Sequence, residues 1–127
     1  MNDAQHLADR YVSVWNEADP ERRRQAIAEI WRPEGQHYVD AREAHGYEAL
    51  EQRIVGSYER NIRDGRHRFR SAPGALSLRD LVVVRWEMMV ADSECKVASG
   101  LAILIVDGDG RIRTDYQFVT DRTPVSA

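Results

Sequence analysis

The two halves of this sequence repeat their apolar residues with different periods, and this change constrains the fold more than any other feature. Up to about residue 64 the apolar residues recur every three or four positions, the spacing of helices with one buried face. Beyond that point, shorter segments bounded by turn residues show the pattern of strands. Helices followed by a run of strands predict an α+β fold, with helices on one face of a largely antiparallel sheet.

Three helices are expected in the first half. The first is capped by Asn2 or Asp3 and has an apolar face from Leu7 to Ala18. The second begins at Asp19-Pro20-Glu21, where aspartate is a good N-cap and proline suits the first helical position. The second buries Ile27, Ile30 and Trp31 and ends at residues 32–35. After a short β-like segment at residues 36–40, a third helix begins at Gly46 and fades near residues 64–65.

Four longer strands are expected in the second half, at residues 67–79, 81–91, 96–106 and 111–120. The last two are joined by Asp107-Gly108-Asp109-Gly110, a tight-turn signal, because glycine and aspartate tolerate positive φ angles. On the 81–91 strand, alternation turns Val84, Trp86 and Met88 inward.

Composition limits the class of protein. The 127 residues, 43% of them hydrophobic, suit a single domain over residues 1–127, and the net charge of −3 gives no basic surplus for nucleic acid. The longest apolar run, residues 101–106, is far shorter than the roughly 20 residues of a membrane span. A lone cysteine, Cys95, and a polar start without signal-peptide features predict a cytoplasmic protein.

Cofactor and metal sites are not expected. The sequence has no glycine-rich phosphate loop, and its four histidines show no zinc spacing. The turn at residues 107–110 starts like a calcium loop, but Phe118 occupies the position of the bidentate glutamate. The sequence therefore predicts no cofactor and no metal ion.

Four stretches carry a resemblance to a known family: residues 10–16 with Asp19-Pro20, Trp31 with residues 38–40, residues 46–50, and residues 107–112. With this order of elements, nearly the whole chain resembles the nuclear transport factor 2-like superfamily, which includes SnoaL-like polyketide cyclases and ketosteroid isomerases. The resemblance implies a cone-shaped, cystatin-like fold whose curved sheet and three helices enclose one apolar pocket. Because one scaffold hosts enzymes and binding proteins, it implies a fold more than an activity.

The resemblance also implies roles for single residues. Tyr11 matches the tyrosine that donates a hydrogen bond to the developing oxyanion in ketosteroid isomerases, and Asp40 matches their proton-shuttling base. Ala102 stands where those enzymes have a protonated aspartate, which argues against steroid isomerisation by their mechanism. Asp115, on the last strand, is an alternative acid or base, since other members use an aspartate on late strands.

The orientation of the last strand has two interpretations. Simple alternation would bury Ile112, Tyr116 and Phe118. A count from the preceding turn against the family instead turns Asp115 and Gln117 into the pocket and puts Tyr116 and Phe118 on the outer face, where members often dimerise. We favour the second interpretation, which predicts a homodimer through the outer sheet face.

The sequence also predicts which residues line the pocket. Several large or polar residues are expected to line the pocket, with a solid core as the alternative: Trp15, Trp31, Tyr38, Tyr58, Val84, Trp86, Met88 and Gln117. His45 could reach the pocket mouth or be solvated. Asp40 beside aromatic walls would be a desolvated base, or else a turn aspartate that caps the backbone.

Two hypotheses for the function remain open. The first is a cofactor-independent isomerase, cyclase or dehydratase that moves a proton on an apolar, carbonyl-bearing substrate, with Asp40 as base, Tyr11 as donor and Asp115 as the alternative. The second is a non-catalytic domain that binds a small apolar molecule in the same pocket.

Overall fold

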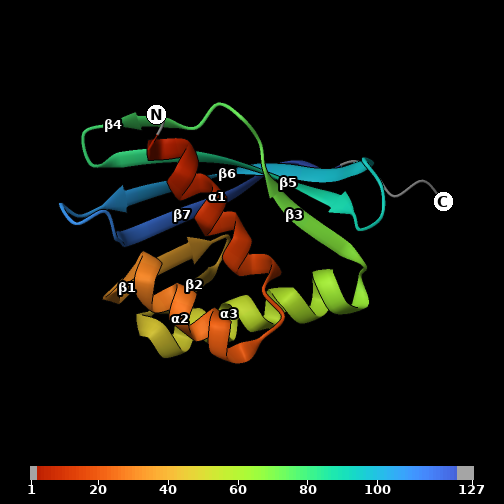
Figure 1. Cartoon of the computed structure of the whole chain (residues 1–127), viewed down its shortest axis with the longest axis horizontal. Helices are drawn as coiled ribbons and strands as arrows, with labels where there is room; N and C mark the ends of the chain where they lie inside the picture. The colour runs from red at the N-terminus through yellow and green to blue at the C-terminus, as the bar shows by residue number, and fades with distance from the viewer. Residues whose placement is uncertain (1–2, 123–127) are drawn as a thin grey trace.

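A computed structural model describes residues 3–122 and confirms the predicted α+β fold. Three helices and a short π-helical segment alternate with the first strands, and the second half is all strand (Figure 1). The elements are α1 (Asp3–Asn16), α2 (Pro20–Ile30), β1 (Trp31–Val39), β2 (Arg42–His45), α3 (Gly46–Ser57), η1 (Tyr58–Asp64), β3 (His67–Ser71), β4 (Leu76–Leu78), β5 (Leu81–Val90), β6 (Lys96–Val106) and β7 (Ile112–Arg122).

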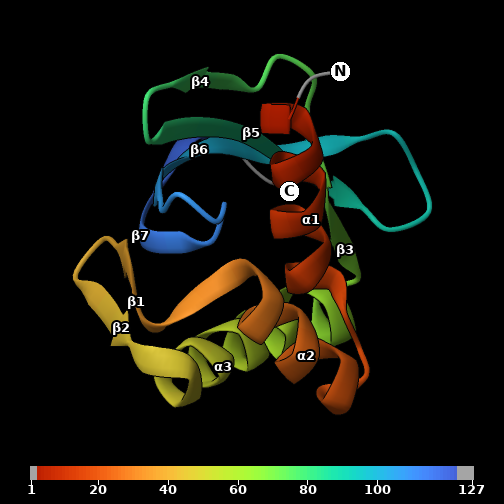
Figure 2. The ribbon, with the colours of Figure 1, turned by 60° about the vertical axis from the view of Figure 1, so that its left-hand side comes forward.

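The seven strands form one curved sheet in the order β2-β1-β7-β6-β5-β3, with β4 paired to the remaining part of β5. Only β1 and β7 run parallel, and every other described pair is antiparallel. Figure 2 shows the sheet bent into an arc with all three helices on its concave side. This curvature leaves room between the sheet and the helices.

The second helix begins where predicted, but it ends at Ile30, before the predicted end at residues 32–35. The Asp19 carboxylate caps it by accepting hydrogen bonds from the backbone N–H groups of Glu21 and Arg22, and Pro20 occupies the first turn. Trp31 closes the helix through a backbone bond to Ile27 but is itself extended, with φ −103° and ψ 153°. It therefore starts β1, which is longer than the predicted segment at residues 36–40 and irregular between Trp31 and Gln36.

The predicted strand at residues 67–79 is two strands. Residues 72–75 interrupt it, where Pro73 lacks a backbone donor and Gly74 has φ +98°. As a result β3 and β4 pair with different parts of β5.

Two local features shape the concave face. The Asn16 side chain at the end of α1 exchanges two hydrogen bonds with the backbone of Phe69, at 2.7 and 2.9 Å, which ties α1 to β3. Gly100 lies opposite Trp86, and a Cβ there would stand 2.3 Å from the indole ring and 2.0 Å from the Phe118 carbonyl oxygen. Only glycine lets the Trp86 ring lie across β6.

Candidate functional site

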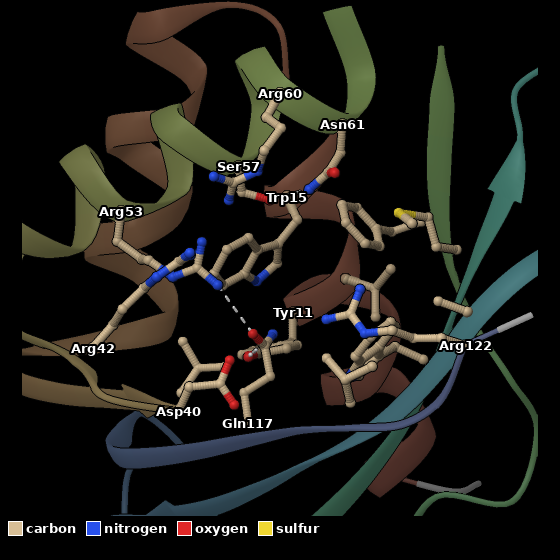
Figure 3. Close-up of a pocket in the computed structure, with 17 residues that line it drawn as sticks. Tyr11, Trp15, Asp40, Arg42, Arg53, Ser57, Arg60, Asn61, Gln117 and Arg122 are labelled. Carbon is tan, nitrogen blue, oxygen red and sulfur yellow. Dashed lines mark hydrogen bonds between the residues drawn. The ribbon is translucent and has the colours of Figure 1, made fainter. Parts of the chain in front are cut away.

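A cavity of about 310 Å³ opens between the concave face of the sheet and the helices (Figure 3). Its wall combines residues of α1, the β1–β2 hairpin, α3, η1 and four strands. The lining residues are Tyr11, Val12, Trp15, Val39, Asp40, Arg42, Arg53, Ser57, Arg60, Asn61, Phe69, Trp86, Met88, Ala98, Gln117, Val119 and Arg122.

The strands supply an apolar part of this wall. Phe69 of β3 and Trp86 of β5 meet edge to face, with ring centroids 6.0 Å apart, and Met88 and Val119 extend the same surface. Because aromatic and aliphatic side chains gain free energy when a ligand removes them from water, this part of the cavity suits an apolar group.

A series of hydrogen bonds between polar side chains begins on the cavity wall with Gln117. The Gln117 amide nitrogen donates to the Tyr11 hydroxyl at 3.3 Å, and its amide oxygen accepts from an Arg53 guanidinium nitrogen, also at 3.3 Å. Figure 3 shows Arg53 reaching from α3 toward Gln117 and Tyr11. Residues from α1, α3 and β7 are thus linked at one point of the pocket.

Behind Tyr11 lies a fully buried carboxylate, Asp115. The Tyr11 hydroxyl donates to Asp115 Oδ2 at 2.7 Å, and His37 Nδ1 lies 2.8 Å from the same oxygen. Because a carboxylate oxygen only accepts, the imidazole donates from Nδ1. Among the described residues, Asp115 Oδ1 and His37 Nε2 have no hydrogen-bond partner although both are buried. This network therefore has unused hydrogen-bonding capacity.

The environment of Tyr11 keeps its hydroxyl protonated. Burial raises the pKa of Tyr11 well above its ordinary value, and the negative charge of Asp115 beside it adds to that shift. Phenolate is thus disfavoured, so the hydroxyl is a hydrogen-bond donor that does not ionise beforehand.

Arginines supply the other polar part of the wall. The Arg53 guanidinium lies over the Trp15 ring, 5.0 Å from its centroid, and burial together with the positive charge of Arg42 lowers the pKa of Arg53. In Figure 3, Arg42, Arg53 and Arg60 point into the pocket from the helix and hairpin side, and Arg122 reaches in from the opposite side.

Asp40 lies on the cavity wall in a setting unlike the one predicted. It follows β1 in the hairpin turn with φ +51° and is exposed. Neither Trp31 nor Tyr38 lines the cavity beside it. The expectation that aromatic walls desolvate Asp40 is therefore wrong, while a role for the carboxylate stays a prediction.

The structure brings six of the predicted site residues to one cavity: Tyr11, Trp15, Asp40, Trp86, Met88 and Gln117. Asp115 joins them indirectly, through its bond to Tyr11.

Five predicted positions lie away from the lining. Trp31 and Val84 are fully buried in the core, where Trp31 packs against Tyr11 at 5.6 Å between ring centroids. Tyr58 faces α2, where the Arg23 guanidinium lies 5.2 Å above its ring. Helix packing, rather than the pocket, accounts for these three side chains.

Tyr38 and His45 lie together on the outer side of the sheet. Tyr38 stacks on Tyr116 with ring centroids 5.5 Å apart, and His45 meets Tyr38 edge-on. Alternation along β1 explains the error, because His37 and Val39 are the buried neighbours and Tyr38 must point the other way. His45 is half-exposed, 3.7 Å from Glu43, and does not line the cavity.

Sequence reasoning missed His37 and the arginines. His37 lies two residues before the buried Val39, so the pattern of β1 could have placed it on the inner face. Arg53 lies three residues after Leu50 and four before Ser57, both buried on the inner side of α3. Arg60 and Arg122 had no comparable signal, because each lies where a regular helix or strand ends.

A bulge settles the two interpretations of β7. Ile112 pairs with Val106 and Thr114 with Ile105, so Arg113 is an extra residue on β7. One inserted residue reverses which side chains face inward. Ile112 is therefore buried as alternation predicted, whereas Asp115 and Gln117 face inward, and Tyr116 and Phe118 are 43% and 53% exposed on the outer face.

Residues 3–122 contain neither a cluster of metal ligands nor a membrane-spanning helix. No three histidine, cysteine or acidic side chains of this part of the chain lie together as metal ligands. No helix among the same residues is long and apolar enough to cross a membrane.

Comparisons with known proteins identify the fold. No family model matches the sequence, and no curated protein matches it. Among solved structures, a proposed isomerase of the SnoaL-like family from Agrobacterium tumefaciens superposes with a TM-score of 0.85 at 21% identity, over 95% of this chain and 100% of that one.

Two further solved structures superpose on this chain with lower TM-scores. A proposed polyketide cyclase from Sinorhizobium meliloti gives a TM-score of 0.64 at 14% identity, covering 92% of this chain and 94% of that one. An NTF2-like protein of unknown function from Exiguobacterium sp. 255-15 gives a TM-score of 0.64 at 19% identity, covering 91% of this chain and 98% of that one. The protein therefore has the nuclear transport factor 2-like fold that the resemblance in its sequence implied.

Proposed function

We propose that this protein is a cofactor-independent enzyme that moves a proton on a small carbonyl compound bound in the pocket. The observation that carries the proposal is the 2.7 Å hydrogen bond from Tyr11, on the cavity wall, to the fully buried Asp115. A phenol that links a pocket to a buried carboxylate provides a path for a proton between substrate and protein.

The proposed step balances without a co-reactant. A proton leaves the carbon next to the substrate carbonyl for the Tyr11 oxygen while the Tyr11 hydrogen passes to Asp115 Oδ2. The electron pair of the broken C–H bond forms an enolate, and Asp115 becomes a neutral acid. Return of the proton at another position gives an isomer. Alternatively, the enolate carbon attacks a second carbonyl carbon of the same substrate, the π bond of that carbonyl breaks, and its oxygen takes the proton back from Asp115 through Tyr11, which gives a cyclised product.

His37 and Arg53 support the two ends of this path. The His37 hydrogen bond at 2.8 Å orients Asp115, so His37 is a positioning residue. The second amide hydrogen of Gln117, whose amide oxygen accepts a hydrogen bond from Arg53, can stabilise the enolate oxygen, because donors fixed in a partly dry site are strong stabilisers of developing charge. Asp40 is the alternative base, and its carboxylate is exposed on the cavity wall.

The test is exchange of substrate protons with solvent deuterium. Small ketones and keto acids are incubated with the protein in D₂O, and loss of the α-proton signal is followed by NMR. Wild-type protein should accelerate exchange, and Tyr11→Phe should lower the acceleration by about 10²–10⁴-fold, the usual contribution of acid-base groups. Tyr116→Phe, an exposed tyrosine on the outer face, is the matched control and should exchange as wild type.

The competing hypothesis, a ligand-binding domain without chemistry, predicts a different result. Ligands would then bind wild type and Tyr11→Phe alike, with no exchange above background in either. Equal exchange by Tyr11→Phe and wild type would also contradict the proposal.

We propose in addition that the protein forms a homodimer through the outer sheet face. Tyr116 and Phe118 are exposed on this face. Their cross-strand partners on β6 are the apolar residues Ile103 and Leu101, respectively. Phe118→Asp should dissociate the dimer in analytical ultracentrifugation, because the charge would be buried in an apolar interface. Wild-type protein that is monomeric at micromolar concentration would contradict this proposal.

A further inference from the structure

The charges on the pocket wall are unbalanced. Four arginines line the cavity, Arg42, Arg53, Arg60 and Arg122, against a single carboxylate, that of Asp40, which is exposed. Within residues 3–122 none of these four arginines forms an ion pair with an acidic side chain. The whole protein carries a net charge of −3, so this positive group is local to the pocket.

Arg53 is the least exposed of the four, since the other three are exposed and Arg53 is partly buried. Its Nε is buried without a hydrogen-bond partner among the described residues, and its one hydrogen bond is the 3.3 Å contact with the neutral Gln117. Burial also lowers the pKa of Arg53, because the guanidinium is partly removed from water. A buried, unpaired charge is costly, and an anionic ligand would offset that cost.

The chemistry of guanidinium narrows the anion. Its planar N–H groups match the two oxygens of a carboxylate or the oxygens of a phosphate. The apolar surface of Phe69, Trp86 and Met88 lines the same cavity, so a ligand that fills it presents an apolar body as well as a charge. A cavity of about 310 Å³ is small for two anionic groups together with an apolar body.

We propose that the ligand is a small keto acid, with its carboxylate bound by Arg53 and its apolar body against Phe69, Trp86 and Met88. Arg42, Arg60 and Arg122 attract the anion to the opening. The apolar carbonyl compound expected from the sequence is thereby narrowed to one that also carries an acid group. The carbonyl group of this ligand rests on the proposed function, whereas its carboxylate rests on the arginines alone.

Matched acid and ester pairs test the carboxylate directly. Dissociation constants are measured by calorimetry for 3-benzoylpropionate, 4-oxopentanoate and phenylpyruvate, each beside its methyl ester, with inorganic phosphate as a further probe. At least one acid should bind wild-type protein about tenfold or more tightly than its ester, as expected for a hydrogen-bonded charge pair. Raising the salt concentration should weaken binding of the acid and leave the ester unchanged.

Variants assign the effect to Arg53. Arg53→Gln should remove the preference for the acid over its ester, whereas Arg53→Lys should retain part of it. Arg85→Gln is the matched control, because Arg85 is exposed outside the cavity lining and has no ion pair in the described part of the chain. Thermal melting checks that each variant is folded, and the comparison of acid with ester on wild-type protein needs no variant.

The outcomes separate this inference from the proposed function. If no acid binds more tightly than its ester, or if Arg53→Gln weakens both equally, the inference is wrong even if α-proton exchange occurs. Inorganic phosphate that binds as tightly as the best acid would also overturn the assignment of a carboxylate. If an acid binds preferentially and no compound exchanges its α-protons, the proposed function fails and the inference stands.

Discussion

Two clusters of charged and polar side chains differ in how completely they are paired. The turn cluster, around the hairpin between β6 and β7, comprises Arg32, Asp107, Asp109, Arg111 and Arg113. Its residues are partly or largely exposed, and each forms an ion pair, at distances from 2.9 to 3.9 Å. The pocket cluster comprises Tyr11, His37, Arg53, Asp115 and Gln117, and three of its buried atoms, Asp115 Oδ1, His37 Nε2 and Arg53 Nε, lack partners among the described residues.

The difference indicates which cluster has a function. Exposed ion pairs contribute only about 0–1 kcal/mol each, and water solvates their charges whether or not they are paired. A buried polar atom without a partner costs about 1–3 kcal/mol, so a fold that retains several in one place has a reason other than stability. We therefore expect substitutions in the pocket cluster to change activity, and matched substitutions in the turn cluster to change little.

The largest expected effect is on turnover. Asp115→Asn keeps the shape of the side chain but lacks a basic oxygen, so α-proton exchange should fall by about 10²–10⁴-fold, while the affinity for the substrate stays near that of wild type. Exchange rates and dissociation constants measured on the same preparation would separate these two effects.

Asp109→Asn gives the same change of charge in the turn cluster and serves as the control. Its exchange rate should equal that of wild type. If the two variants behaved alike, the distinction between the clusters would have no functional meaning.

The next effect is on stability. His37→Ala removes a buried donor to Asp115, and loss of a hydrogen bond to a charged group should cost about 1.5–3 kcal/mol, with a further cost for the cavity left behind. Arg111→Ala, which breaks an exposed pair, should cost at most about 1 kcal/mol. Urea unfolding of both variants measures the difference, and a His37→Ala variant no less stable than Arg111→Ala would break the comparison.

Sequence periodicity was sufficient for the α+β class, and the family resemblance supplied the rest of the fold and part of the site. Helix starts depend on local chemistry, such as the Asp19 cap and Pro20, and could be predicted from neighbouring residues. The bulge at Arg113 and the break at Pro73-Gly74 depend on how strands pair across the sheet, and alternation alone cannot reveal an inserted residue.

The site was harder to predict because its residues converge from distant elements. Tyr11 and Asp115 are 104 positions apart, so only the family resemblance connected them in the sequence. The aromatic size of a side chain predicts burial but does not tell which side of β1 or α3 the side chain occupies. His37 and Arg53 lie on the inner side of these elements, whereas Tyr38, one residue after His37, points outward.

The third effect appears at alkaline pH and again distinguishes the buried hydroxyl from exposed ones. Burial raises the folded-state pKa of Tyr11 above the ordinary value of 10.0. The stability linked to this shift is fully present below the unfolded pKa and is lost as the pH rises through the folded pKa, because the unfolded chain ionises first. Unfolding free energies measured between pH 8 and pH 11 should therefore fall more steeply for wild type than for Tyr11→Phe.

Tyr116→Phe is the control for this pH dependence when the protein is diluted below the dissociation constant of the proposed dimer, since Tyr116 is 43% exposed in the single chain. Its stability should follow the wild-type curve over the same range. A Tyr11→Phe curve parallel to wild type would mean that the hydroxyl is not held in the dry environment proposed for it.

The smallest effect is expected at Asp40, which shares features with both clusters because it lines the pocket yet is exposed. Its φ of +51° lies in the left-handed region, which asparagine tolerates as well as aspartate, so Asp40→Asn should change the unfolding free energy by less than about 0.5 kcal/mol. Because the Asp40 carboxylate is exposed and has no side-chain hydrogen bond among the described residues, exchange should fall far less than in Asp115→Asn. If Asp40→Asn instead lost as much exchange as Asp115→Asn at unchanged stability, Asp40 would be the base, and burial would not be the property that marks the catalytic carboxylate in this pocket.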